Sequence, residues 1–261
     1  MYKERIPKKI HFTWFSNDPY PSLVSECMAT WQGKLPDYEF VHWDMSKIQD
    51  IDNLFLHQAL EKRKWAFAAD FVRLYALYHE GGIYLDTDVE VYKSFNDLLN
   101  LPAFIGRENS FHEENRRGVR YLTSHCMGGE RHHPFFKACL DYYDGRPFVL
   151  SSNDWLPDKL KYDQTILPLI QKDIAFLQGY NPSEKIKGIQ ELHNGLRIFP
   201  YEYFDCHYQV SKSYCRHLAL GGWRGNGTKA VSKIKDGLKA RAYLTVSGIF
   251  GLFNLCTFRK Y

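Results

Sequence analysis

The feature that most constrains this chain is a helix pattern that stops at a glycine pair and is followed by a short apolar run and two acidic residues. Apolar residues recur at i, i+4, i+7 and i+11 between about residues 62 and 80, namely Phe67, Phe71, Leu74 and Tyr78. This spacing predicts a helix packed on a sheet. Gly81 and Gly82 end the helix, and residues 83–85 and 89–91 predict short strands on either side of Asp86-Thr87-Asp88.

The rest of the chain alternates strand and helix patterns. We expect strands over 9–15, 38–43, 102–106 and 197–200, and helices over 22–32 and around 54–60. This alternation favours the α/β class with a mostly parallel central sheet, in which ligands bind at the carboxyl edge of the strands. The charged, His-rich residues 107–126 fit a variable loop over a cleft.

Amino-acid composition limits the classes of protein to which this chain can belong. The 261 residues are 44% hydrophobic and 25% charged, which suits one globular enzyme domain. The net charge is +4, but residues 228–261 contribute +6, so the remainder carries −2 and favours no nucleic-acid partner. The six cysteines lack a disulfide or CxxC pattern, and the N-terminal residues lack a signal peptide. We therefore expect reduced thiols in a cytoplasmic protein.

Asp86 and Asp88 are the first candidates for chemistry. In an extended segment their carboxylates point the same way and can share a hard divalent cation such as Mg²⁺ or Mn²⁺. Such a cation can bind diphosphate oxygens and neutralise charge on a leaving nucleoside diphosphate. The alternative is a solvated turn, which is the more common setting for an isolated Asp-x-Asp. The position after a helix, a glycine stop and a short strand favours the ligand interpretation.

Residues 65–90, with Asp70, Arg73, the Gly81-Gly82 stop and Asp86-Thr87-Asp88, resemble the glycosyltransferases that possess a sugar-binding DXD motif. This group is glycosyltransferase family 32, which includes capsular and lipooligosaccharide transferases and yeast initiating α-1,6-mannosyltransferases. A more distant likeness runs to the large clostridial glucosylating toxins. The resemblance extends from Ile6 to about Trp223. It implies a GT-A fold in a single Rossmann-type domain, retention of anomeric configuration, a Mn²⁺ or Mg²⁺ cofactor and a UDP- or GDP-sugar donor.

The resemblance also suggests roles for three residues on the amino-terminal side. Asp70 and Arg73 lie on one helix face, and by resemblance they contact the donor sugar and its phosphate; the alternative is an intrahelical ion pair worth about 0.2–0.5 kcal/mol. By resemblance, Trp14 stacks on the nucleotide base, with core packing as its alternative.

Two residues near the end of the domain complete the implied site. By resemblance, His217 is the third metal ligand, through a neutral imidazole nitrogen, and Trp223 covers the donor diphosphate as a lid. Gly222 stands where the family commonly has Ser, so the chain departs from the family pattern directly before the lid residue.

Three further residues have structural alternatives. Asp163 resembles a family position on the acceptor side, where it could bind an acceptor hydroxyl, or it could be a helix N-cap. We expect His133 to start a helix and His11 to be a structural histidine inside its strand.

We place the domain boundary near residue 226, which gives a glycosyltransferase domain over 1–226 and a tail over 227–261. From Lys229 onward the tail reads as a basic amphipathic helix, followed by an apolar stretch slightly short of a membrane span. We expect peripheral contact of residues 228–261 with the inner face of a membrane, the alternative being packing on the domain or on a second subunit.

These features together predict a retaining, metal-dependent hexosyltransferase that uses a nucleotide sugar and a glycan or lipid-linked oligosaccharide acceptor, in the synthesis of a surface polysaccharide such as a capsule. Two alternatives remain. One is another metal-dependent nucleotide-sugar enzyme, a nucleotidyltransferase or pyrophosphohydrolase. The other is a nucleotide-sugar-binding protein without turnover.

Overall fold

The computed structural model describes residues 4–109, 119–206 and 210–221. By its internal contacts the chain divides after His217. Trp223, the predicted tail and the boundary predicted at residue 226 lie outside the described residues. Within the described part, no helix is both long enough and apolar enough to cross a membrane.

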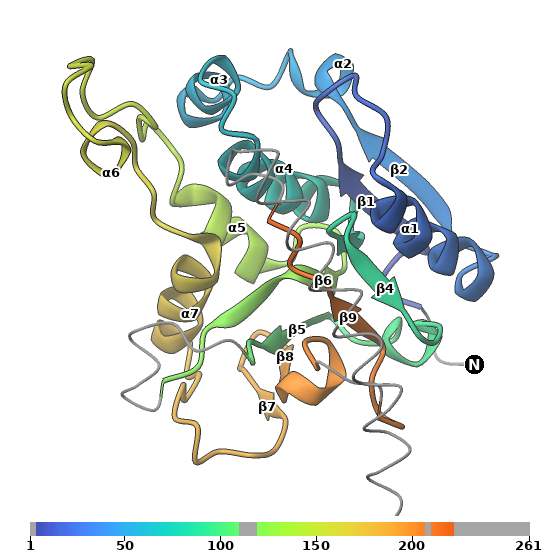
Figure 1. The fold of residues 1–261 in the computed structure, drawn as a ribbon. Helices are drawn as coiled ribbons and strands as arrows, with labels where there is room; N and C mark the ends of the chain where they lie inside the picture. The colour runs from blue at the N-terminus through green and yellow to red at the C-terminus, as the bar shows by residue number, and fades with distance from the viewer. Residues whose placement is uncertain (1–3, 110–118, 207–209, 222–261) are drawn as a thin grey trace, which may run out of the picture. The chain divides into compact units, whose positions relative to one another are not determined.

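A seven-stranded sheet forms the centre of the molecule (Figure 1). Its strands lie in the order β2-β1-β3-β6-β5-β8-β7, and only β6 and β7 run against the other five. The predicted α/β class with a mostly parallel sheet is therefore confirmed. The strands are β1 (Lys9–Thr13), β2 (Glu39–Trp43), β3 (Gly82–Leu85), β5 (Ala103–Arg107), β6 (Leu122–Gly129), β7 (Gln190–Glu191) and β8 (Leu196–Phe199).

Helices cover the sheet on both faces. The helices are α1 (Ser22–Lys34), α2 (Met45–Ile48), α3 (Leu54–Glu61), α4 (Trp65–Glu80), α5 (Pro134–Asp141), α6 (Asp158–Lys161) and α7 (Leu167–Leu177). One core lies between the sheet and α3, α4, α5 and α7, and a second lies on the opposite face, under α1. Tyr84 of β3 points into the first core and its neighbours Ile83 and Leu85 point into the second, as the two-residue period of a strand requires.

A separate two-stranded sheet pairs β4 (Val89–Val91) with β9 (Cys215–His217). The strands are antiparallel, and His217 lies opposite Val89. Arg216 Nη2 and Glu90 Oε2 form an ion pair of 2.7 Å across the same ladder. Figure 1 shows β9 beside β4, although the two strands are far apart in the sequence.

The predicted glycine stop ends α4 as expected. Gly81 has φ +68° directly after the last helical residue, and Gly82 has φ +108° at the start of β3. A Cβ atom on Gly82 would lie 2.9 Å from the carbonyl oxygen of Lys9. This turn needs the left-handed backbone freedom of glycine, and it brings the chain from α4 directly into β3.

The interpretation of residues 107–126 as a loop is wrong in its last part, because β6 begins at Leu122 and lies between β3 and β5. The run Leu122-Thr123-Ser124-His125-Cys126 has one β-branched residue and no regular apolar alternation. Its strand state comes from pairing with both neighbours. Observed β1 also ends at Thr13, two residues before the predicted end.

Candidate metal centre

The structure brings the three predicted metal ligands together. Asp86 follows β3 directly, Asp88 precedes β4, and His217 ends β9. One ligand atom from each residue lies within 4.8 Å of the others. His217 Nε2 lies 3.2 Å from Asp88 Oδ1. The β4–β9 ladder causes this meeting, since it places His217 opposite the residue that follows Asp88.

The carboxylates control the charge of His217. Burial acts to lower its pKa, but the negative charges of Asp88, Asp86 and Asp205 raise the pKa of His217 to about 9. Without a metal ion the imidazole is therefore protonated at neutral pH and paired with Asp88. A neutral nitrogen is needed for coordination, so a metal ion would replace this proton.

The donor set fits the cation that the sequence resemblance implies. Carboxylate oxygens suit Mg²⁺ and Mn²⁺, and an imidazole shifts the preference toward a transition ion such as Mn²⁺. The side chains of Asp86, Asp88 and His217 are 24%, 16% and 25% exposed, so a ligand from solvent can reach them. A second Asp-x-Asp, Asp50-Ile51-Asp52, has both carboxylates exposed between α2 and α3.

Arg73 lies behind Asp86 and is nearly buried, with 5% of its side chain exposed. Its Nη1 is 3.2 Å from Asp86 Oδ1 and donates to the carbonyl oxygen of Ser124 at 2.6 Å. Its Nη2 is 3.2 Å from Asp70 Oδ1, and its guanidinium lies over the Tyr84 ring. Tyr84 Oη also donates to Asp86 Oδ1, at 3.0 Å. Arg73 therefore fixes the first acidic residue of the motif.

Asp70 is the second buried member of this arrangement. Desolvation by burial raises the pKa of Asp70 to about 6, although the Arg73 charge acts to lower it. The Leu167 amide at the start of α7 also bonds to Asp70. The intrahelical ion pair considered as the alternative is therefore present, and it is buried and also connects α4 with Asp86 and with α7. Contact of Asp70 and Arg73 with the donor stays a prediction.

Trp14 lies in the turn after β1 and belongs to neither core, so the core-packing alternative is wrong. Its Nε1 donates to the carbonyl oxygen of Asp18 at 3.0 Å. Its ring meets Tyr20 edge-on at 5.0 Å. The residue is partly exposed, and stacking of its ring on a nucleotide base stays a prediction.

Asp163 is buried, and the N-cap interpretation of this residue is wrong, because α7 begins at Leu167 with Ile166 as its cap. Its Oδ1 accepts from the backbone N and the hydroxyl of Thr165, which forms a local Asx turn. Its Oδ2 lies 3.3 Å from Arg146 Nη1. Contact with an acceptor stays a prediction.

Two histidines have the structural roles predicted for them. His11 Nε2 donates to the Gly81 carbonyl at 2.7 Å, and its Nδ1 accepts from Trp43 Nε1 at 3.1 Å. His133 caps α5 by accepting from the Phe135 amide.

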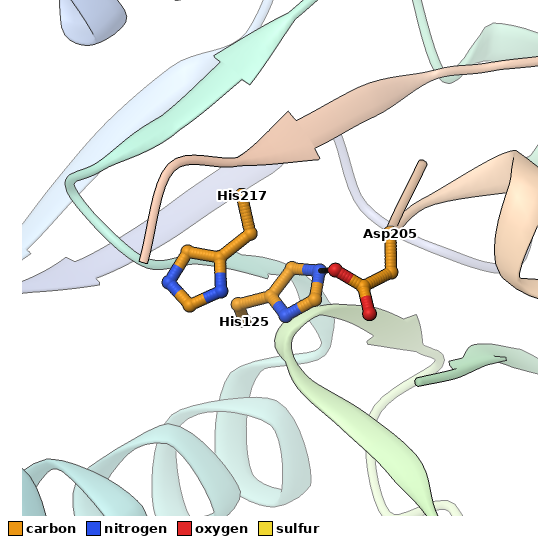
Figure 2. Close-up of side chains that lie close together, drawn as sticks. All are labelled: His125, Asp205 and His217. Carbon is orange, nitrogen blue, oxygen red and sulfur yellow. Dashed lines mark ion pairs between the residues drawn. The ribbon is translucent and has the colours of Figure 1, made fainter. Parts of the chain in front are cut away.

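His125 is a site residue that the sequence interpretation missed. It lies on β6, 3% exposed, and its ring stacks on His217 with centroids 4.4 Å apart. Figure 2 shows His125 next to His217, with Asp205 on its other side. No local pattern could reveal this role, because His125 fell in the segment expected to be a loop.

Residues 21–105 match the family described as glycosyltransferase sugar-binding region containing DXD motif. Over 134 residues the chain is 31% identical to inositol phosphoceramide mannosyltransferase 3 of Schizosaccharomyces pombe, which covers 50% of this chain and 35% of that protein. It is 28% identical over 229 residues to an uncharacterized glycosyltransferase of Acanthamoeba polyphaga mimivirus, 84% of each chain. The solved PaToxG glycosyltransferase aligns at 19% identity over 67% of this chain and 71% of its own, with a TM-score of 0.46.

The chain thus spans about a third of the length of the yeast mannosyltransferase. The match to the family, by contrast, covers α4, the glycine stop and both motif carboxylates. Residues 21–105 of this chain are therefore similar to the glycosyltransferase sugar-binding region that contains the DXD motif.

Proposed function

We propose that this chain is a metal-dependent glycosyltransferase that moves a hexose from a nucleotide-sugar donor to a glycan or lipid-linked acceptor. The observation that carries this proposal is the meeting of Asp86 and Asp88, in the turn between β3 and β4, with His217 at the end of β9. The match of residues 21–105 to a sugar-binding region supports the same class of reaction.

The residues of the site divide into two groups. Asp86, Asp88 and His217 would hold the divalent cation. When bound, that cation would neutralise charge on the departing nucleoside diphosphate. Arg73 and Asp70 form the buried support, which keeps Asp86 oriented without rearrangement during the reaction.

Retention of anomeric configuration is part of the proposal. A double displacement needs a carboxylate nucleophile close to the anomeric carbon. Asp70 is committed to Arg73 and to the Leu167 amide, so we assign it to positioning. We favour the same-face route, in which the leaving phosphate helps to deprotonate the acceptor hydroxyl and the site supplies orientation and charge stabilisation.

The names of the relatives suggest the substrates. Inositol phosphoceramide mannosyltransferases 2 and 3 of Schizosaccharomyces pombe share 29% and 31% identity with this chain over the aligned regions. We therefore propose mannose as the first hexose to test and a lipid-linked acceptor as the first acceptor class. Surface polysaccharide synthesis is the process in which such a transfer is proposed to take place.

The basic tail, which lies outside the described residues, is the basis for a proposal about where the protein lies in the cell. We propose that the protein is cytoplasmic and that residues 228–261 attach it to the inner face of a membrane, with each basic residue near anionic lipid worth about 1 kcal/mol. The full chain should sediment together with anionic vesicles, and the variant Lys229→Glu/Lys233→Glu/Lys235→Glu should stay in the supernatant. Equal retention of both would contradict this attachment.

The function is tested by incubating the protein with Mn²⁺, a panel of UDP- and GDP-sugars and candidate acceptors. We expect nucleoside diphosphate from one donor, and loss of this product in Asp86→Asn/Asp88→Asn. The matched control is Asp50→Asn/Asp52→Asn, which changes the same residue types at the same spacing in an exposed turn. It should keep full turnover.

The products separate the alternatives. A nucleotidyltransferase or pyrophosphohydrolase cleaves the diphosphate, so nucleoside monophosphate or sugar phosphate in place of nucleoside diphosphate would contradict sugar transfer. Donor binding without any product, with every acceptor class present, would indicate a binding protein.

A further inference from the structure

The His217 imidazole contacts groups on two sides. On one side its Nε2 faces Asp88 at 3.2 Å. On the other side its ring stacks on His125, with an angle of 21° between the planes. His217 is the last residue of β9, so the ladder fixes its backbone but leaves its side-chain torsions to be set by these neighbours.

His125 is itself held firmly. Its Nε2 donates to the Phe204 carbonyl oxygen at 3.1 Å, and Asp205 Oδ1 lies 3.9 Å from the same nitrogen. Its backbone carbonyl accepts from the Asp86 amide at 3.0 Å, which connects β6 to the first motif carboxylate.

His125, Asp205 and His217 form a second possible group of metal ligands, because one ligand atom from each residue lies within 4.8 Å of the others. The ring geometry argues against it. Imidazole lone pairs lie in the ring plane, and planes only 21° apart at 4.4 Å do not direct both lone pairs to one ion. The Nε2 atom of His125 also carries the proton that it donates to Phe204. The stack therefore orients His217 and does not add a ligand.

We propose that His125 is a positioning residue that holds the His217 ring with its Nε2 directed at the Asp86 and Asp88 carboxylates. The inference rests on the proposed metal role of these three residues. Partners that orient a ligating histidine usually contribute about 10- to 100-fold to metal affinity. Here the orienting contact is the flat face of a neighbouring ring.

The test measures Mn²⁺ affinity directly, by the loss of the free-ion signal in electron paramagnetic resonance titrations without donor or acceptor. His125→Leu keeps an apolar side chain of similar bulk but removes the flat ring, and should weaken Mn²⁺ binding about 10- to 100-fold. His125→Phe restores a flat ring without nitrogen, and its affinity should stay closer to that of the wild type than the affinity of His125→Leu does. The matched control is His133→Ala, another buried histidine, which removes the α5 cap and should leave Mn²⁺ affinity unchanged.

A measurement on the unaltered protein avoids dependence on the folding of variants. Pulsed electron paramagnetic resonance of the Mn²⁺-loaded protein counts directly bound imidazole nitrogens, and we expect one. Two bound imidazoles would overturn the positioning role and make His125 a ligand. Equal losses in His125→Leu and His125→Phe would overturn the role of the flat ring. Wild-type affinity in His125→Leu would overturn the inference while the metal site stands. Failure of the wild type to bind Mn²⁺ would overturn both.

Discussion

At the scale of single residues, the site depends on buried charges that hold one another in place. Arg73 contacts Asp70, Asp86 and the carbonyl oxygen of Ser124, while Tyr84 donates to Asp86 from the other side. Removing one member leaves the remaining buried charges less well compensated, which costs more than losing an exposed ion pair. The motif carboxylate is therefore fixed by residues that solvent barely reaches.

Arg73→Lys tests this support. Lysine keeps the charge but lacks the planar fork that reaches two carboxylates and a carbonyl at once. We expect the free energy of unfolding to fall by on the order of 2 kcal/mol and Mn²⁺ binding to weaken. Urea unfolding of the metal-free protein measures the first and a metal titration the second. Arg197→Lys, in an exposed pair with Glu191, is the control and should change stability by less than about 0.5 kcal/mol. Equal stability of the two variants would contradict the prediction.

Asp70 gives stability a pH dependence. Its pKa is raised to about 6 in the folded protein from an ordinary value of 3.8, so the folded state binds the proton more tightly. Stability therefore falls as pH rises from about 4 to 6, by at most about 1.4 kcal/mol per pH unit. Asp70→Asn lacks this component, so its stability relative to the wild type should increase across the same window and level off above it. Urea unfolding at several pH values with a chelator present measures the difference. If the free energy of unfolding changed with pH in the same way for both proteins, Asp70 would not titrate between about pH 4 and 6.

At the scale of elements, the turn between α4 and β3 sets where the motif begins. Any shift of β3 would move Asp86, which directly follows it, relative to β4 and β9. The turn packs against Lys9 of β1, so a single added atom affects two strands.

Gly82→Ala should therefore destabilise the protein. The added Cβ would lie 2.9 Å from the Lys9 carbonyl oxygen, at a φ of +108° that alanine rarely adopts. We expect a loss of more than about 1 kcal/mol in the free energy of unfolding. Gly33→Ala in α1 is the control, since a Cβ there meets nothing within 4 Å, and it should be neutral or slightly stabilising. Thermal or urea unfolding of both proteins decides the matter; equal effects would contradict the strain at the turn.

At the scale of the whole molecule, metal binding should stabilise the fold, because His217 of β9 meets Asp86 and Asp88 of the β3–β4 turn only when the chain is folded. Mn²⁺ at about 100 times its dissociation constant should add about 2.7 kcal/mol to the free energy of unfolding. The gain should disappear with a chelator and in Asp86→Asn/Asp88→Asn, and persist in Asp50→Asn/Asp52→Asn. A gain of the same size in the Asp86/Asp88 variant would place the ion elsewhere.

The sequence by itself determined the features that depend on neighbours along the chain. The spacing of Phe67, Phe71 and Leu74 predicted α4, and the glycine pair predicted its end. The acidic pair after a short strand predicted cation chemistry at a sheet edge. The predictions of the helix, its end and the strand succeed because helix periodicity, turn geometry and strand alternation are local properties of the backbone.

Only the tertiary structure decided which distant segments meet. β6 is a strand because β3 and β5 pair with it, and this pairing places His125 against His217. Asp163 lies too far before α7 to cap it, which local composition could not reveal. His217 reaches Asp88 through the β4–β9 ladder, and the three residues of β9 carry almost no periodic signal of their own. Pairing between remote short strands is determined by the packing of the whole chain, so the complete site exists only in the folded molecule.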